Sequence, residues 1–451
     1  MENQDKRIEL YTSVVPNARQ LGIQEMKFYA FIHYTVNTFT NKEWGDGKEN
    51  PAVFNPTGQN TDQWCEAIKS AGMKGVILTC KHHDGFCLWQ TKTTEHSVKN
   101  SPYKGGKGDV AKELSESCRK YGLKFGVYLS PWDRNSEYYS TDKYMDFYIA
   151  QLTELLTGYG EIFMLWLDGA CEPKRDGKSI QEYDFERIWS TALNLQPKIA
   201  ISGCAPDIRW VGNESGVSRE SEWNVVPKFR YEFQNFAVNC QKYDYFENFK
   251  NRCKDVYHKD MGSREFLADY NEFIWYPAEV DVSIRRGWFY HSIENFSVKS
   301  LKHLMKIYYS AVGGNSLLLL NIPPNKQGLF CKNDVARLKE MGDWLKVEDD
   351  CVINKIVIKQ TNPFEISLDF EKQAVDRVRL SEDTTKSQRI EKFSVYAEDI
   401  CVYTGTVIGF SKIAIFDEPV TTANLKIVID ACRKEPFINK IEVCKTGAYR
   451  F

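Results

Sequence analysis

The stretch EIFMLWLDGACEP, residues 161–173, decides the fold. Large apolar side chains run without a break from Ile162 to Leu167, and an acidic residue, Asp168, follows at once. A short continuous apolar run of this kind is typical of a strand that is buried on both faces. A carboxylate directly behind such a strand lies at its carboxyl end, where parallel sheets and barrels place their functional groups. The stretch therefore predicts a buried parallel strand and makes Asp168 a functional candidate.

Short apolar runs and amphipathic helical patterns alternate on both sides of this strand. Strands are expected to begin near Met26, Gly75 and Lys124, and the run KIAISG (198–203) follows as a fifth. The helix in GDVAKELSESCRKYG (108–122) is expected to be capped by Asp109 and to end at Gly122. Regularity returns after residue 298 with a helix, the strand NSLLLLNIPP (315–324) and a further helix over 333–345.

Seven to eight such strand-helix units predict a (β/α)8-like, TIM-type barrel. A doubly wound sheet is the alternative, but it usually carries a glycine-rich phosphate turn after its first strand, and this sequence has none there. Between 207 and 286 the pattern loosens, and we expect long loops for substrate recognition. After residue 346 short alternating runs such as FEISLDF and KIAIFDE predict an all-β sandwich. The expected domains are a catalytic barrel over 1–345 and a β-sandwich over 346–451.

Composition and charge exclude several classes of function. The net charge of −2, with scattered basic residues, argues against nucleic-acid binding. Thirteen cysteines without a CxxC pair indicate neither a disulfide framework nor a zinc ribbon. No apolar run is long enough to cross a membrane, and the first residues lack a signal-peptide pattern, so we expect a cytoplasmic protein, with an exported form whose signal was removed as the alternative. The sequence carries no signal for an oligomeric state.

Polar and aromatic residues follow the expected strands at the ends where a barrel has its active site. The first strand delivers His33, the second His82 and His83, the third Tyr128, and the fourth Trp166 before the acid. Single histidines in such places are more often structural than catalytic. A shared metal ion is the weaker interpretation of the histidine pair, because adjacent strand residues point to opposite faces.

The acid that ends the fourth strand suits a nucleophile, because Trp166 shares its strand face by period two and supplies an aromatic wall. Glycosidic cleavage needs such a carboxylate on one side of a sugar and a proton donor on the other. The second acid is expected from the loop-rich region, where Glu214, Glu220 and Glu222 are candidates. Periodicity does not choose among them.

Five motifs, in this order and at this spacing, resemble the α-L-fucosidases of glycoside hydrolase family 29. They are FIHYTVNTFTNKEWG (31–45), LTCKHHDGFCLWQT (78–91), GVYLSPWD (126–133), MLWLDGA (164–170) and RWVGNESG (209–216). The resemblance covers roughly residues 10–345, and the set is far more specific than any one motif.

The resemblance implies a retaining, two-step displacement in which Asp168 is the nucleophile. It places the acid/base in the G-N-E sequence, which makes Glu214 the choice and Glu220 the reserve. The fucose pocket that it implies consists of His33, Glu43, Trp44, His82, His83, Tyr128 and Trp166, with Trp288 as a further wall. Neither a metal nor a cofactor is implied.

The segment DIRWVGNESG (207–216) is similar to the subgroup that acts on branched 1,3- and 1,4-linked fucose. The resemblance therefore implies hydrolysis of Lewis-type oligosaccharides and glycoconjugates as the function. A broad-specificity α-L-fucosidase and a non-catalytic fucose-binding barrel are the alternatives. A metal-dependent hydrolase that uses the three histidines would lose activity with a chelator.

Overall fold

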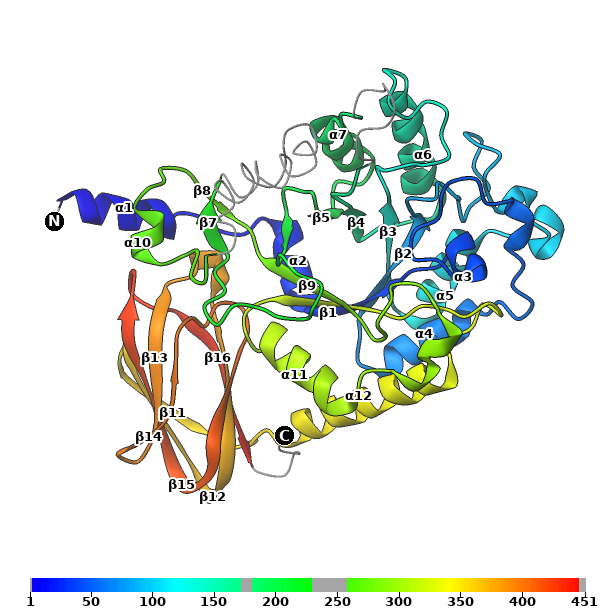
Figure 1. Ribbon diagram of the computed structural model, residues 1–451. Helices are drawn as coiled ribbons and strands as arrows, with labels where there is room; N and C mark the ends of the chain where they lie inside the picture. The colour runs from blue at the N-terminus through cyan, green and yellow to red at the C-terminus, as the bar shows by residue number, and fades with distance from the viewer. Residues whose placement is uncertain (1, 172–180, 229–257, 446–451) are drawn as a thin grey trace.

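The apolar run after Glu161 forms β4 (Met164–Leu167), one of eight parallel strands of a closed barrel (Figure 1). The computed structural model describes residues 2–171, 181–228 and 258–445. Around the barrel the strands are β1 (Phe28–Ile32), β10 (Leu317–Asn321), β9 (Ala278–Ser283), β6 (Ile208–Trp210), β5 (Ala200–Gly203), β4, β3 (Lys124–Leu129) and β2 (Gly75–Lys81). The predicted TIM-type barrel is confirmed.

Helices follow most of these strands and cover the barrel (Figure 1). They are α4 (Thr61–Ser70), α5 (Val110–Tyr121), α6 (Tyr144–Gly158), α7 (Phe185–Leu195), α11 (Leu301–Ala311) and α12 (Lys332–Asp350). As predicted, the Asp109 side chain caps α5 by accepting a hydrogen bond from the Lys112 backbone, and Gly122 ends it with φ +71.

The region from 207 to 286, expected to consist of loops, contains two barrel strands, so that expectation is wrong in part. β6 follows β5 after a short loop with no helix between them, and β9 occupies AEVDVS (278–283). β6 is too short to show a period, and the acids of β9 alternate with valines in a way that is typical of a surface strand. A separate antiparallel pair, β7 (Val225–Pro227) with β8 (Phe273–Trp275), lies between them in sequence.

Alternation along each barrel strand separates two hydrophobic cores. In β4, Leu165 and Leu167 belong to the layer between strands and helices. Met164 and Trp166 belong to the barrel interior. The shared strand face that the sequence indicated for Trp166 and the acid two residues later is the interior face.

The amino end of the barrel is closed by apolar side chains from both ends of the chain. Ile23 and Met26 of α2 (Ala18–Met26) pack in the interior core together with Phe410, which precedes the strand β15 (Lys412–Cys432). We call these three side chains the stopper. It leaves the opposite, carboxyl end of the barrel as the open end.

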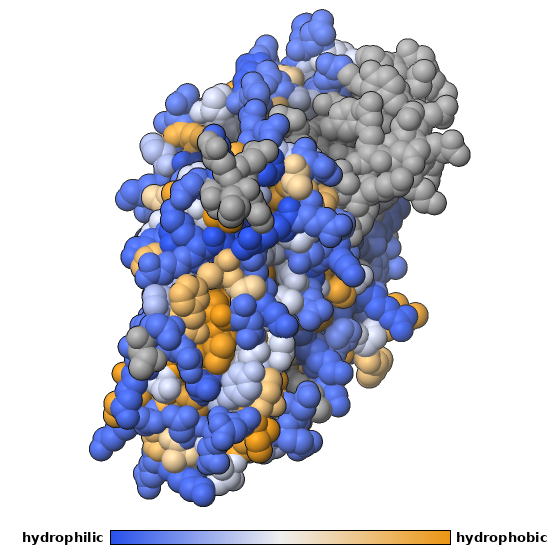
Figure 2. Space-filling view, turned by 90° about the vertical axis from the view of Figure 1, so that its left-hand side faces the viewer, coloured by the Kyte–Doolittle hydropathy of each residue, from blue (hydrophilic) through white to orange (hydrophobic). Residues whose placement is uncertain are grey.

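The C-terminal part is an antiparallel, six-stranded sheet with its own hydrophobic core. Besides β15, its strands are β11 (Val357–Asn362), β12 (Glu365–Glu382), β13 (Ile390–Ala397), β14 (Ile400–Gly405) and β16 (Ile438–Lys445). The expected all-β domain is confirmed, while α12 runs through residue 346, where we placed the boundary. The face of the molecule that carries this domain is mostly hydrophilic, with apolar side chains among the polar ones (Figure 2). No helix in the described ranges is both long and apolar enough to cross a membrane.

Candidate active site

Asp168 lies directly behind β4 at the open end of the barrel, and its side chain is 27% exposed. Its Oδ1 accepts a hydrogen bond from the Ala170 backbone at 2.8 Å, which turns the chain away from the strand. Gly203, the last residue of β5, has φ +84, and a Cβ there would lie 2.1 Å from the Leu167 carbonyl oxygen. Only glycine therefore lets β5 approach the chain this closely beside Asp168.

The other oxygen of this carboxylate faces two side chains that the sequence predicted for the site. The Tyr128 hydroxyl donates a hydrogen bond to Asp168 Oδ2 at 2.9 Å. His83 Nε2 lies 3.8 Å from the same oxygen. Burial and the charge of Asp168 raise the pKa of Tyr128 well above its ordinary value, so the phenol keeps its proton and remains a donor.

His33, His82 and His83 are buried together at this end of the barrel. Burial lowers the pKa of His33 to about 3, with the Asn321 hydrogen bond and the charge of Asp168 opposing the shift. Burial also lowers the pKa of His82 and of His83. All three imidazoles are therefore neutral near pH 7, and each offers one N–H donor and one bare nitrogen.

The tautomer of His83 follows from its neighbours. The Ser130 hydroxyl donates to the Trp132 carbonyl at 2.7 Å, so it has no proton left for His83 Nδ1, which lies 2.8 Å away. Nδ1 must then be the N–H of the neutral ring, and Nε2 carries the lone pair on the side of Asp168. That nitrogen can accept a hydrogen bond from a ligand hydroxyl.

The argument that strand alternation separates the two adjacent histidines is wrong. β2 ends at Lys81, before the pair, and the ring centroids of His82 and His83 lie only 4.0 Å apart. Across the described residues, however, no group of three or more His, Cys, Asp or Glu side chains is arranged to hold a metal ion.

Below the mouth, the Trp166 indole is fixed by an acid that sequence reasoning missed. Trp166 Nε1 donates to Glu279 Oε1 at 2.6 Å, and the Ser202 hydroxyl donates to the same oxygen at 2.9 Å. The Tyr29 hydroxyl donates to Glu279 Oε2. Burial raises the pKa of Glu279, and these three hydrogen bonds oppose the rise.

Asp281, two residues further along β9, is a second missed acid. Trp210 Nε1 donates to its Oδ1 at 2.7 Å. Burial raises the pKa of Asp281 well above its usual range, and the charges of Glu214 and Glu279 add to the rise. The signal that could have found both acids is the period of AEVDVS, because a barrel strand must turn one face inward and Val280 and Val282 pack against the helices.

Glu214 lies in the loop after β6, on the rim of the open end. Its Oε2 accepts a hydrogen bond from Trp288 Nε1 at 3.1 Å. Glu214 as a whole is exposed, but neighbouring side chains enclose its carboxyl group in part. This partial burial raises the pKa of Glu214, the charges of Asp168 and Glu43 add to the rise, and the Trp288 hydrogen bond opposes it.

The two other candidate acids lie elsewhere. The backbone carbonyl of Glu220 accepts a hydrogen bond from Thr406 of the C-terminal domain at 3.1 Å, and its charge acts on Lys412 of that domain. Glu222 is fully buried and forms ion pairs with Arg209 and Arg219. Within the described part of the chain, Glu214 is the one of these three acids whose pKa is raised by the charge of Asp168.

Glu43, expected to line the pocket, holds the loop after β9. Its Oε2 accepts from the Trp288 backbone at 2.8 Å, and its Oε1 accepts from the Phe289 backbone at 3.2 Å. His291 Nε2 lies 2.5 Å from Oε1. Glu43 thus fixes the segment that carries Trp288, whose ring lies 5.0 Å from that of His33 between centroids.

Trp44, the neighbour of Glu43, is 61% exposed at the mouth. Its ring makes edge contacts with Trp132 and His83, at centroid distances of 5.8 and 6.2 Å. An exposed indole in this position offers an apolar face to a ligand above the histidines.

Comparison with known proteins gives one family. The model of the family "Alpha-L-fucosidase" matches residues 17–350. The α-L-fucosidase 1 of Arabidopsis thaliana is 35% identical over 94% of this chain and 86% of its own. A Bacteroides ovatus crystal structure, provisionally assigned as an α-L-fucosidase, is 43% identical over 99% of this chain and 77% of its own, with a TM-score of 0.89. A family 29 fucosidase from Ruminococcus gnavus in complex with fucose is 26% identical over 96% of this chain and 95% of its own, with a TM-score of 0.79.

Proposed function

This chain belongs to the α-L-fucosidase family of glycoside hydrolases, and we propose that it is a retaining enzyme in which Asp168 is the nucleophile and Glu214 the acid/base. Its proposed substrates are Lewis-type oligosaccharides and glycoconjugates with 1,3- or 1,4-linked fucose. Fucose released from such chains is one product, and the defucosylated oligosaccharide is the other.

In the first step Asp168 attacks the anomeric carbon of fucose while Glu214 transfers its proton to the glycosidic oxygen. The carbon–oxygen bond to the leaving sugar breaks, and a covalent fucosyl ester forms on Asp168. The hydrogen bonds from Tyr128 and the Ala170 backbone hold both oxygens of the nucleophile, so little reorientation is needed before attack.

In the second step Glu214, now a carboxylate, takes a proton from water, and the oxygen of that water displaces Asp168 from the sugar. Two influences support Glu214 in both roles. Its raised pKa keeps the proton available for the first step. Once the ester has formed, Asp168 is no longer charged, so the same repulsion no longer favours the protonated acid.

The neutral histidines support recognition of an uncharged sugar. His33, His82 and His83 offer donors and acceptors to hydroxyl groups without placing a positive charge beside the ester. Trp166, Trp44 and Trp288 supply apolar faces of the kind that suits the 6-methyl group and the sugar ring. We assign Glu43 to the same pocket through its hold on Trp288, although its carboxylate is already bonded to backbone amides.

The observation that carries the proposal is the pairing of two acids with different environments at one barrel mouth: Asp168 held by hydrogen-bond donors, and Glu214 with a raised pKa. The assignment is tested with a fluorinated fucosyl fluoride, whose ester with the enzyme forms quickly and is hydrolysed slowly. We expect a mass increase on the peptide that contains Asp168, and α-fucose as the first product seen by NMR with an ordinary substrate. Labelling of another residue, or β-fucose as first product, would contradict the assignment.

The linkage preference is tested separately on a panel of Lewis trisaccharides and 1,2-fucosylated glycans. We expect the 1,3- and 1,4-linked compounds to have the highest kcat/KM. A 1,2-linked glycan as the best substrate would overturn the subgroup assignment and leave the family and the two acids untouched.

A further inference from the structure

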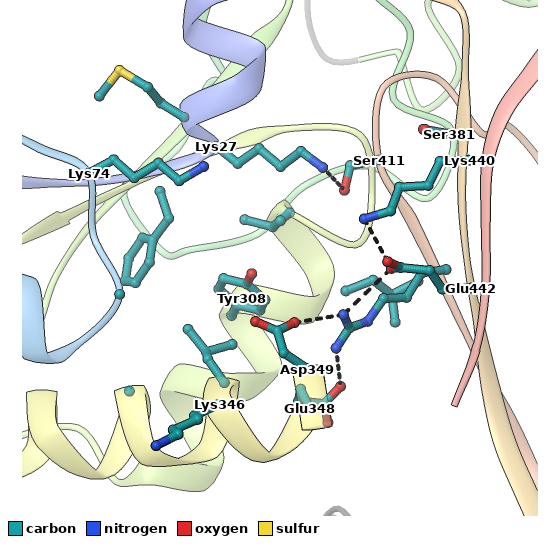
Figure 3. Close-up of a pocket in the computed structure, with 18 of the residues that line it drawn as sticks. Lys27, Lys74, Tyr308, Lys346, Glu348, Asp349, Ser381, Ser411, Lys440 and Glu442 are labelled. Carbon is teal, nitrogen blue, oxygen red and sulfur yellow. Dashed lines mark hydrogen bonds and ion pairs between the residues drawn. The ribbon is translucent and has the colours of Figure 1, made fainter. Parts of the chain in front are cut away.

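A second cavity lies at the amino end of the barrel, at the opposite end from Asp168, where the barrel meets the C-terminal sheet (Figure 3). Its volume is about 510 Å³. The barrel part contributes residues from α2, β1, α4, α11 and α12, and the C-terminal domain contributes residues from β12, β15 and β16. The charged lining residues are Lys27, Lys69, Lys74, Lys346, Lys412, Lys440, Arg379, Glu348, Asp349 and Glu442.

The acids of this lining are already bound by cations. Arg379 contacts Glu348, Asp349 and Glu442, at distances between 2.8 and 3.7 Å. Lys440 binds Glu442 at 2.8 Å. In Figure 3 these pairs form one network on the side of the cavity that carries the C-terminal sheet.

The other lysines have no carboxylate partner within ion-pair distance among the residues that the structure describes. Lys74 Nζ donates to the Glu25 carbonyl and Lys69 Nζ to the Tyr121 carbonyl, both neutral acceptors. Lys27 Nζ lies 3.3 Å from the Ser411 hydroxyl (Figure 3). The lining therefore keeps an excess of positive charge.

Lys27 is the most unusual member of this group. It follows α2 with φ +58, a backbone conformation that residues other than glycine rarely adopt. The chain is held there by the bond from its N–H to the Ile23 carbonyl. Burial lowers the pKa of Lys27 to about 8, the charges of Lys440 and Lys74 add to the shift, and Glu442 opposes it. A half-buried ammonium group that is repelled by its neighbours is stabilised by any anion that enters the cavity.

We propose that this cavity binds a small phosphorylated sugar between the two domains. Phosphate offers several acceptor oxygens to the ammonium groups of Lys27 and Lys74 and to the Ser411 hydroxyl. The volume exceeds that of a phosphate ion by far, so it accommodates an attached sugar ring. Because residues of both domains line the cavity, such a ligand stabilises their junction and leaves the chemistry at the other end of the barrel unchanged.

Thermal unfolding and calorimetry with glucose 6-phosphate test the proposal, at constant ionic strength. Inorganic phosphate, neutral glucose and sodium chloride are the comparison ligands. We expect glucose 6-phosphate to raise the melting temperature in a saturable way and to bind more tightly than inorganic phosphate, with no effect of glucose or chloride. Equal shifts with all salts, or equal affinity for the two phosphates, would overturn the sugar phosphate as ligand.

Three variants locate the site. Lys27→Met keeps the unbranched stem and removes the charge, so we expect the free protein to be at least as stable and the ligand to bind roughly tenfold more weakly or worse. Lys74→Met, at an exposed position, should weaken binding less. Lys392→Met, on the exposed face of β13 and outside the cavity, is the matched control and should bind as the wild type does. Unchanged binding in both Lys27→Met and Lys74→Met would place the ligand elsewhere, while all three variants should hydrolyse an aryl fucoside normally.

Discussion

Two pairs of acids occupy the upper barrel and differ mainly in depth. Asp168 and Glu214 lie at the rim, where each carboxylate keeps a side open to an incoming ligand. Glu279 and Asp281 lie beneath them in β9, buried and bonded to indoles and hydroxyls of the interior. Carboxylates that are similar in chemistry thus take different tasks: the rim acids can react, and the deep acids can hold the aromatic walls. Substitutions at both depths test this division.

The largest loss of activity is expected for Asp168→Asn. The amide has nearly the same shape but is a poor nucleophile, so kcat should fall by roughly 10³-fold or more. Fucose binding, measured by calorimetry, should change little. Turnover near the wild-type value would remove Asp168 from the chemistry.

Glu214→Ala should lose activity in a way that depends on the leaving group. Oligosaccharides need protonation of the departing oxygen, so we expect a loss of about 10²–10⁴-fold for them. Aryl fucosides with good leaving groups should react far better, and azide should accelerate the second step. Glu220→Ala is the control, and it should behave as the wild type; if it shows the azide response instead, the acid has been assigned to the wrong residue.

Glu279→Gln tests the deep pair and should act on stability more than on chemistry. The amide can no longer accept all the hydrogen bonds from Trp166, Ser202 and Tyr29, and it adds donors that lack a partner. We expect a loss of about 1–3 kcal/mol in the free energy of unfolding. Denaturant unfolding measures this loss of stability. In steady-state kinetics, KM should rise more than kcat falls. A loss of kcat as large as that of Asp168→Asn would contradict the assignment of different tasks to the rim acids and the deep acids.

The smallest effect is expected for the pH profile of Trp288→Phe. The indole hydrogen bond lowers the pKa of Glu214, so its removal should raise that pKa further. Glu214 must carry a proton for the first step, and activity is lost as pH rises through its pKa. The alkaline limb of kcat/KM should therefore move to higher pH in the variant. A shift to lower pH would show that the indole acts mainly by excluding water.

The sequence was a good guide where patterns are local. The strand before Asp168 was predictable because six apolar residues in a row leave few other structures, and Asp109 and Gly122 marked the bounds of α5. β9 was missed because its inward acids have partners far away in the chain, such as Tyr29 and Trp166. The alternation in AEVDVS places both acids on one face, but a surface strand shows the same period, so the period reveals the buried face only once the strand is known to belong to a barrel.

The same limit applies to individual site residues. The sequence placed Glu43 in the pocket, but only the structure shows that its oxygens bind the backbone of Trp288 and Phe289, which lie far along the chain. Likewise, the close contact of His82 with His83 follows from the end of β2 at Lys81, a boundary that the sequence leaves open by a few residues.

The stopper at the amino end of the barrel bears on how the protein is made. Ile23 and Met26 leave the ribosome long before Phe410, because all eight barrel strands lie between them in the sequence. Until Phe410 has emerged, the stopper lacks one of its three side chains, and apolar surface at the amino end of the barrel stays exposed. Completion of the barrel interior therefore waits for Phe410 in the C-terminal domain, and a nascent chain that ends before residue 410 is expected to recruit chaperones.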